Sequence, residues 1–122
     1  MDRSEDVLRE LAMHDEAALS SALAIRPDIP GDLAIDARAC ALIRFAALVC
    51  VDGPVVSYQS AVALALGAGA TSHEIVDTLR AIVAVTGPAR VVAAAPAVAL
   101  AIGYDIAAAL EAYEATAWQD SG

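Results

Sequence analysis

The pattern of apolar and polar positions predicts a chain of helices joined by short corners. Over residues 2–24, apolar side chains recur at the spacing of one helix face, and this predicts an amphipathic opening helix with a break near His14 and Asp15. Two prolines and a glycine within residues 26–31 predict a loop. The hydrophobic part of the chain begins after that loop.

The next helix is apolar on nearly every side, which is typical of a central, buried helix. It is expected to start at Asp36, a good N-cap residue, and to run to about Val51. Arg44 is its one charged interior residue. Three roles stay open for this guanidinium: it reaches the edge of the protein, it pairs with an acid, or it faces a pocket.

Residues 53–86 predict two further helices joined by a glycine corner at 67–69. The first should begin within residues 54–57. The second should begin at Thr71, whose side chain can accept from the backbone N–H of Glu74 while the Glu74 carboxylate accepts from the N–H of Thr71.

The last part of the chain is also expected to be helical. Residues 87–88 end the preceding helix, and residues 89–102 predict a helix that Pro96 kinks or splits. Asp105 is then expected to cap a final helix that ends near Ala117. Because no alternation typical of strands is found, we predict an all-α bundle of about six helices in a single domain, residues 1–122.

The composition predicts association between copies of the chain. Hydrophobic residues make up 59% of the sequence, above the ~45–50% of an ordinary soluble domain. One small domain cannot hide so much apolar surface, and a homo-oligomer (a dimer, trimer or hexamer) is the expected outlet. A membrane span is the competing outlet. It is disfavoured because the longest uncharged run, residues 53–72, contains Ser57, Tyr58, Gln59, Ser60 and three glycines. The run at residues 91–104 is too short and contains Pro96.

Charge limits the other partners. The formal net charge is −9, and phosphate binding needs a basic face, so no nucleic-acid partner is expected. The polar, acidic opening of the sequence has no apolar leader, and a cytoplasmic location is the expectation.

Cys40 and Cys50 stand ten positions apart on one predicted helix, about 15 Å along its axis, which is too far for a disulfide. Buried structural thiols are the expectation, with thiol redox chemistry as an alternative. His14 has only Asp15 and Glu16 nearby in sequence, so neither a metal site nor a cofactor is predicted.

Two runs of sequence resemble a known family. Residues 35–43 (IDARACALI) and residues 63–79 (ALALGAGATSHEIVDTL) are similar to the helix opening and to the "helix, Gly-Ala-Thr, Glu-Ile, helix" centre of the carboxymuconolactone decarboxylase and alkylhydroperoxidase D family. The resemblance covers about residues 35–104. It implies an all-helical bundle that assembles into oligomers.

The reactive residues of that family are missing at the matching positions. Where its redox branch carries Cys-x-x-Cys-x-x-x-His, this sequence has Pro54, Ser57 and Ala61. The decarboxylase branch places a carboxylate at the position of Ser57 and a histidine at that of Ala61. Thiol-dependent peroxide reduction and standard lactone decarboxylation are therefore both disfavoured, because their thiolates or titrating groups are absent.

A polar cluster nevertheless stands where relatives keep their chemistry: Ser57, Tyr58, Gln59 and Ser60. In a structural interpretation Ser57 caps the helix, Tyr58 packs with a wet hydroxyl, and Gln59 is solvated.

In a functional interpretation the cluster binds a small apolar carboxylic acid or lactone. Tyr58 and Gln59 donate hydrogen bonds, Ser57 and Ser60 line the pocket, and Arg44 or Arg90 holds a carboxylate. Asp52 supplies a base, so Tyr58 and Asp52 are the catalytic candidates. His73, on the outer first turn of its helix, is expected to be exposed.

Two functions of different classes follow. The first is a lyase- or decarboxylase-like enzyme whose catalytic groups have moved. The second is a catalytically silent, oligomeric binding or interaction module. An enclosed pocket at residues 57–60 with a buried charge within reach would favour the enzyme.

Overall fold

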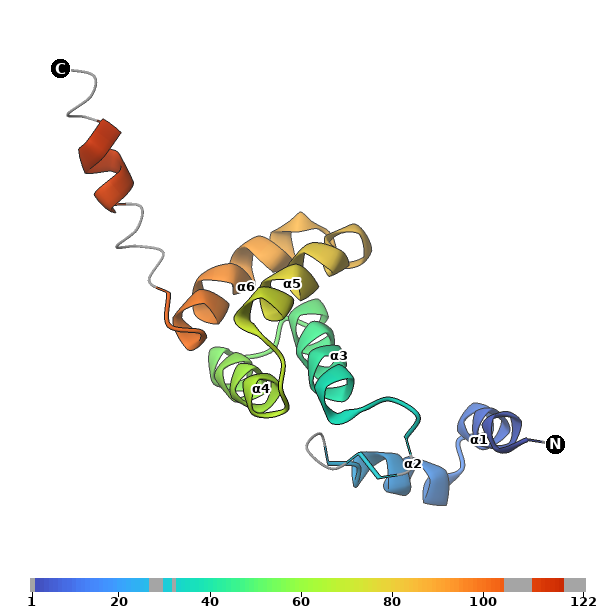
Figure 1. Cartoon of the computed structure of the whole chain (residues 1–122). Helices are drawn as coiled ribbons and strands as arrows, with labels where there is room; N and C mark the ends of the chain where they lie inside the picture. Colours follow the sequence, from blue (N-terminus) through green and yellow to red (C-terminus); the bar gives the residue numbers. More distant parts are fainter. Residues whose placement is uncertain (1, 27–29, 32, 105–110, 118–122) are drawn as a thin grey trace.

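The computed structural model describes residues 2–26, 30–31, 33–104 and 111–117. These ranges contain α1 (Arg3–Ala12), α2 (Glu16–Leu23), α3 (Ala37–Cys50), α4 (Val55–Gly67), α5 (Ser72–Thr86) and α6 (Pro88–Ala101), with one more helical segment at 111–117 (Figure 1). No strand occurs in them, so the all-α prediction is confirmed. The predicted cap at Asp105 lies outside the described residues.

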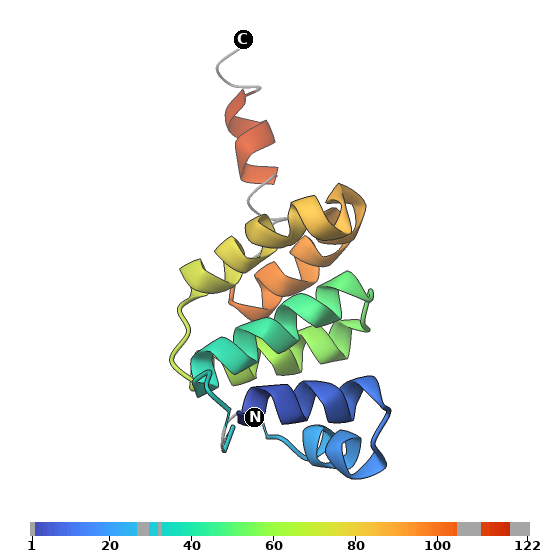
Figure 2. The same ribbon diagram turned by 90° about the vertical axis from the view of Figure 1, so that its right-hand side faces the viewer.

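Helices α3 to α6 form a four-helix bundle. α3 packs against α4 and α5, and α6 packs against the same two helices from the other side (Figures 1 and 2). Four apolar side chains at its centre, Phe45, Val49, Val62 and Ile75, are fully buried. Alanines fill much of the remaining core, which allows the helices to approach closely.

The helix α3 is less central than its sequence suggests. It buries one face, through Cys40, Ala41, Phe45 and Val49, while Ile43 on another face is 54% exposed. The prediction of a helix buried on nearly all sides is therefore wrong for the single chain, because the bundle covers only the side of α3 that faces α4 and α5.

The predicted starts of α3 and α5 are confirmed. The Asp36 carboxylate accepts from the backbone N–H of Ala39 at 2.8 Å. The Thr71 hydroxyl accepts from the N–H of Glu74 at 3.0 Å, and the Glu74 carboxylate accepts from the N–H of Thr71 at 2.9 Å. Both helices thus satisfy amide groups that a helix end leaves unpaired.

The predicted break near His14 and Asp15 separates α1 from α2. His14 has a φ of 58°, a left-handed conformation that cannot continue a helix. Asp15 then caps α2, and its carboxylate accepts from the N–H groups of Ala17 and Ala18 at 2.9 and 3.1 Å.

Two details around α4 and α6 differ from the sequence expectations. The N-cap of α4 is Pro54, without a side-chain cap, so the prediction that Ser57 caps this helix is wrong. Ser57 lies inside the first turn, and its own N–H donates to the Pro54 carbonyl at 2.9 Å. Pro96 does not split α6, which continues through it from Pro88 to Ala101.

The α1–α2 hairpin lies apart from the bundle. Neither helix contains a buried residue, and neither packs against α3, α4, α5 or α6 (Figure 1). Leu8 is 67% exposed and Leu23 is 87% exposed. The hairpin therefore shows its apolar face to solvent in the single chain.

Apolar side chains are also exposed on the bundle, among them Val51, Val56, Val85 and Val92. Among the helices that the structure describes, none has both the length and the apolar character needed to cross a membrane. The hydrophobic excess of the sequence is therefore found at the surface as well as in the core.

Candidate functional site

A shallow groove of about 280 Å³ runs between α3 and α4. We call it the α3–α4 groove; its lining residues are Ala41, Arg44, Leu48, Val56, Ser57, Ser60, Ala61 and Leu64. The α3 residues recur every three or four positions, which places them on one face of that helix. The walls are mainly apolar, with two hydroxyl groups and one charge.

Arg44 supplies that charge. Its Nη2 donates to the backbone carbonyl of Ile25, just beyond the end of α2, at 2.7 Å. A cation is favourable there because the carbonyls at a helix C-terminus carry a partial negative charge. Within the described ranges no carboxylate lies within 4.0 Å of the guanidinium, so of its three possible roles Arg44 combines an edge position with lining a groove.

Tyr58 lies in the core of the bundle rather than in the α3–α4 groove. It is 3% exposed and packs in the core of the bundle, and it does not line the α3–α4 groove. Consecutive helical positions differ by about 100°, so Ser57 and Tyr58 face different sides of α4.

Two charged groups lie near Tyr58. Asp52, in the turn before α4, and Arg90, on α6, form an exposed ion pair with 4.0 Å between Oδ2 and Nη1. Burial raises the pKa of the Tyr58 phenol, and the Asp52 carboxylate raises it further, while the Arg90 guanidinium opposes both effects. The phenol is therefore held in its neutral, protonated form at neutral pH.

The predicted site residues thus separate into groups. Arg44, Ser57 and Ser60 share the groove, whereas Tyr58 lies in the core near Asp52 and Arg90. Gln59 is exposed and lines neither place. The structure does not assemble them into one pocket.

The groove offers little acid–base chemistry. Arg44 is its one titratable lining residue, and a guanidinium does not exchange protons near neutral pH. The groove is open to solvent, and no charged side chain is buried among the residues that the structure describes. General acid–base catalysis needs a group that exchanges protons near the working pH within hydrogen-bond reach, and the described residues that line the groove include no such group.

Cys40 is buried and Cys50 is half-buried, and both are free thiols. Neither lines the groove. Over the described part of the chain, no three His, Cys, Asp or Glu side chains come together in a way that could hold a metal ion.

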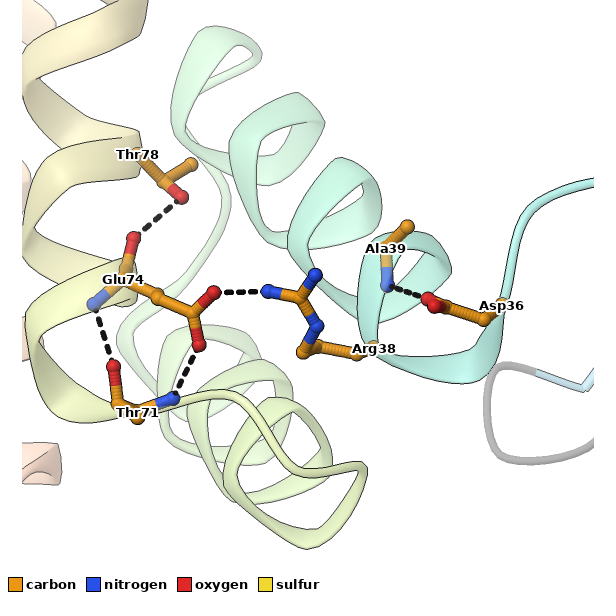
Figure 3. A network of polar contacts seen from close by, with 6 residues as sticks. All are labelled: Asp36, Arg38, Ala39, Thr71, Glu74 and Thr78. Carbon is orange, nitrogen blue, oxygen red and sulfur yellow. Dashed lines mark hydrogen bonds and ion pairs between the residues drawn. The ribbon is translucent and has the colours of Figure 1, made fainter.

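One polar network was not anticipated from the sequence. The Arg38 guanidinium on α3 pairs with the Glu74 carboxylate, which also closes the capping box of α5 (Figure 3). Sequence reasoning gave Glu74 a capping role only. The available signal was that Arg38 and Glu74 each lie in one of the two family-like runs, but nothing in the sequence showed that these residues meet.

His73 is 84% exposed, as predicted, and its Nε2 lies 3.3 Å from Oδ2 of Asp77 one turn later. This is a surface contact along α5. It adds no chemical group to the groove.

A wider hollow, of about 960 Å³, is lined by the α1–α2 hairpin together with Leu33 and Ala34. We call it the hairpin face; its lining residues are Arg3, Ser4, Val7, Leu8, Glu10, Leu11, Asp15, Ala17, Ala18, Ser21, Ala22, Ile25, Leu33 and Ala34. The sequence indicated an amphipathic helix here, but not that its apolar side would be uncovered.

Comparison of the chain with protein-family models, with curated proteins and with solved structures finds no match. The resemblance to the carboxymuconolactone decarboxylase and alkylhydroperoxidase D family therefore stays a prediction from the two sequence runs.

Proposed function

We propose that this chain is a catalytically silent, self-associating helical module built on a scaffold like that of the carboxymuconolactone decarboxylase and alkylhydroperoxidase D family. The observation that carries the proposal is the α1–α2 hairpin, which has an apolar face and no buried residue.

The hairpin needs a cover to be stable. α1 has 10 residues and α2 has 8, and isolated helices shorter than ~12–15 residues are marginal in water. Tertiary packing normally supplies the missing stability, but neither helix packs on the bundle. Association with another chain provides that packing and also hides exposed apolar side chains.

The lining of the α3–α4 groove, which includes no acid or base among its described residues, supports the proposed lack of catalytic activity. Tyr58, one of the two catalytic candidates, is buried with a raised pKa, which makes it a poor base at neutral pH. Asp52, the other candidate, lies in an exposed turn and pairs with Arg90 rather than with a group in the groove.

The test is the mass of the full chain in solution. Sedimentation equilibrium over a hundredfold range of concentration should give a multiple of the 12.4 kDa chain mass. A monomer across that range would overturn the self-association. Turnover of a lactone, or of a peroxide with a thiol donor, at a rate proportional to protein concentration would show that the chain is catalytically active and would contradict the proposal.

A second candidate function is favoured by the make-up of the groove. Arg44, Ser57 and Ser60 converge on apolar walls, and a small apolar carboxylic acid would find there a cation, two hydroxyl groups and hydrocarbon surface. Octanoate titrated into the isotopically labelled chain should then shift the amide resonances of α3 and α4. Arg44→Gln should abolish these shifts, whereas Arg80→Gln, on the surface of α5, should keep them.

A further inference from the structure

We infer that the hairpin face of one chain packs into the α3–α4 groove of a second copy, and that the second copy does the same in return. This inference rests on the proposed self-association and names the two surfaces that carry it. The resulting assembly is a two-fold dimer in which each chain covers the open groove of the other.

The two surfaces suit each other in character. The hairpin face presents leucine, valine and alanine side chains from α1 and α2, including Val7, Leu8 and Leu11. The groove presents Leu48, Val56 and Leu64 together with small alanine and serine side chains. On α1, Val7, Leu8 and Leu11 form an exposed apolar stripe along one helix. A helix with such a stripe laid into an apolar groove is a recurrent mode of association between proteins.

Charge selects the groove over a second hairpin as the partner surface. The hairpin, residues 2–25, carries six carboxylates and two arginines. Its face includes Glu10 and Asp15 together with Arg3. Two hairpins packed on each other would bring these excess acids together, whereas the one charge of the groove is the Arg44 cation.

The two surfaces together have about as many residues as one side of a standard interface. The hairpin face has fourteen lining residues and the groove has eight, and in a reciprocal exchange every chain contributes both sets. The total falls within the ~20–30 residues that each partner contributes to a standard interface. A single docking event would engage only half of this surface.

The groove and the hairpin are already continuous at one point. Arg44 binds the Ile25 carbonyl, so the end of α2 sits at the edge of the groove in the single chain. The body of the hairpin makes no packing contact with α3 or α4, and Figure 1 shows α1 off to one side of the bundle. It is therefore placed to reach a neighbouring chain.

Cross-linking between two different variants tests this geometry. In a Cys50→Ser background, which leaves only the buried Cys40, one chain carries Leu8→Cys and is labelled with ¹⁵N, while the other carries Val56→Cys and is unlabelled. After mixing and treatment with a short bismaleimide, we expect one labelled and one unlabelled chain in the main cross-linked product. Replacing Val56→Cys by Val85→Cys, at a position that is 84% exposed on α5, should remove this product.

The other outcomes overturn the inference in distinguishable ways. Cross-linking within Leu8→Cys alone would show hairpin-to-hairpin packing. A chain that carries both Leu8→Cys and Val56→Cys provides a further control. If this chain is cross-linked within itself while the mixture gives no cross-linked product, the hairpin folds onto the groove of its own chain. If the chain is oligomeric but gives none of these products, it associates through another interface and the inference is wrong. If the wild-type chain is monomeric, the proposed self-association is wrong as well.

A charge placed on the hairpin gives a second measurement. Leu8 is largely exposed in the single chain, so Leu8→Glu should leave the bundle folded and weaken dimerisation by at least about tenfold in Kd. Val85→Glu introduces the same charge outside both surfaces and should leave Kd unchanged. Equal effects of the two variants would contradict the inference.

Discussion

The Arg38 guanidinium on α3 pairs with one oxygen of the Glu74 carboxylate, while the other oxygen caps α5 (Figure 3). One side chain thereby fixes the first turn of α3 against the first turn of α5. These turns belong to the two sequence runs that resemble the carboxymuconolactone decarboxylase and alkylhydroperoxidase D family.

Removal of the shared carboxylate should cost more than removal of its ion-pair partner. Glu74→Ala loses both the cap and the ion pair, and we expect a loss of about 1–2 kcal/mol in the free energy of unfolding. Arg38→Ala loses only a partly exposed ion pair, for which about 0–1 kcal/mol is expected. Urea denaturation at a fixed protein concentration measures both values, since association would otherwise shift them.

The double variant isolates the coupling between the two residues. Once Glu74 is alanine, Arg38→Ala should have no further effect. If Arg38→Ala costs the same in both backgrounds, the guanidinium acts independently of Glu74 and the structural role assigned to the pair is wrong.

The core of the bundle should be sensitive to truncation at Phe45. This side chain is fully buried between α3 and its neighbours, so Phe45→Ala leaves a cavity and should cost about 3–5 kcal/mol. Val85→Ala, at an exposed position of α5, should change stability by less than about 0.5 kcal/mol. Thermal and urea unfolding followed by circular dichroism compare the two; similar losses would contradict the assigned core.

Substitution by alanine should lower the free energy of unfolding at one glycine and raise it at another. Gly87 joins α5 to α6 with φ 90° and ψ 155°, a conformation that alanine adopts only with strain, so Gly87→Ala should cost about 1–3 kcal/mol. Gly67 is the last residue of α4, and a methyl group there would meet open space. Gly67→Ala should therefore stabilise the chain by up to about 1 kcal/mol. Stabilisation by both variants in urea denaturation would contradict the backbone assigned at Gly87.

Local signals in the sequence predicted the helices well. The caps at Asp36 and Thr71 and the break at His14 depend on neighbouring residues, and such local interactions are visible in the sequence. Helix periodicity gave the all-α class for the same reason.

The arrangement of the candidate site could not be predicted in the same way. Ser57 and Tyr58 are adjacent in sequence but face a surface groove and the core, respectively, because the direction of α4 relative to α3 and α6 decides which side is buried. The contact of Arg38 with Glu74 joins two residues that are 36 positions apart in the sequence and lie on different helices. The uncovered hairpin face likewise depends on packing, which periodicity alone does not specify.

The buried phenol of Tyr58 should make the stability of the chain sensitive to alkaline pH. Burial and the Asp52 carboxylate raise its pKa above the ordinary value of 10.0, so over that interval the folded chain keeps a proton that the unfolded chain loses. The stabilisation from this group is therefore complete below about pH 10 and is lost as pH rises through the folded-state pKa. Tyr58→Phe should flatten the fall in unfolding free energy between pH 9 and 11, roughly the range around a tyrosine pKa.

Matched variants separate this effect from general alkaline damage. Tyr104→Phe removes a phenol that is 56% exposed and should keep the fall of the wild-type chain. Asp52→Asn removes a carboxylate that raises the Tyr58 pKa, so the absorbance change of the buried phenolate should begin at lower pH, whereas Arg90→Gln removes an opposing cation and should delay it. Urea denaturation at several pH values, with phenolate absorbance recorded on the folded chain, measures both quantities. An identical pH dependence in Tyr58→Phe and Tyr104→Phe would show that Tyr58 is not the group responsible.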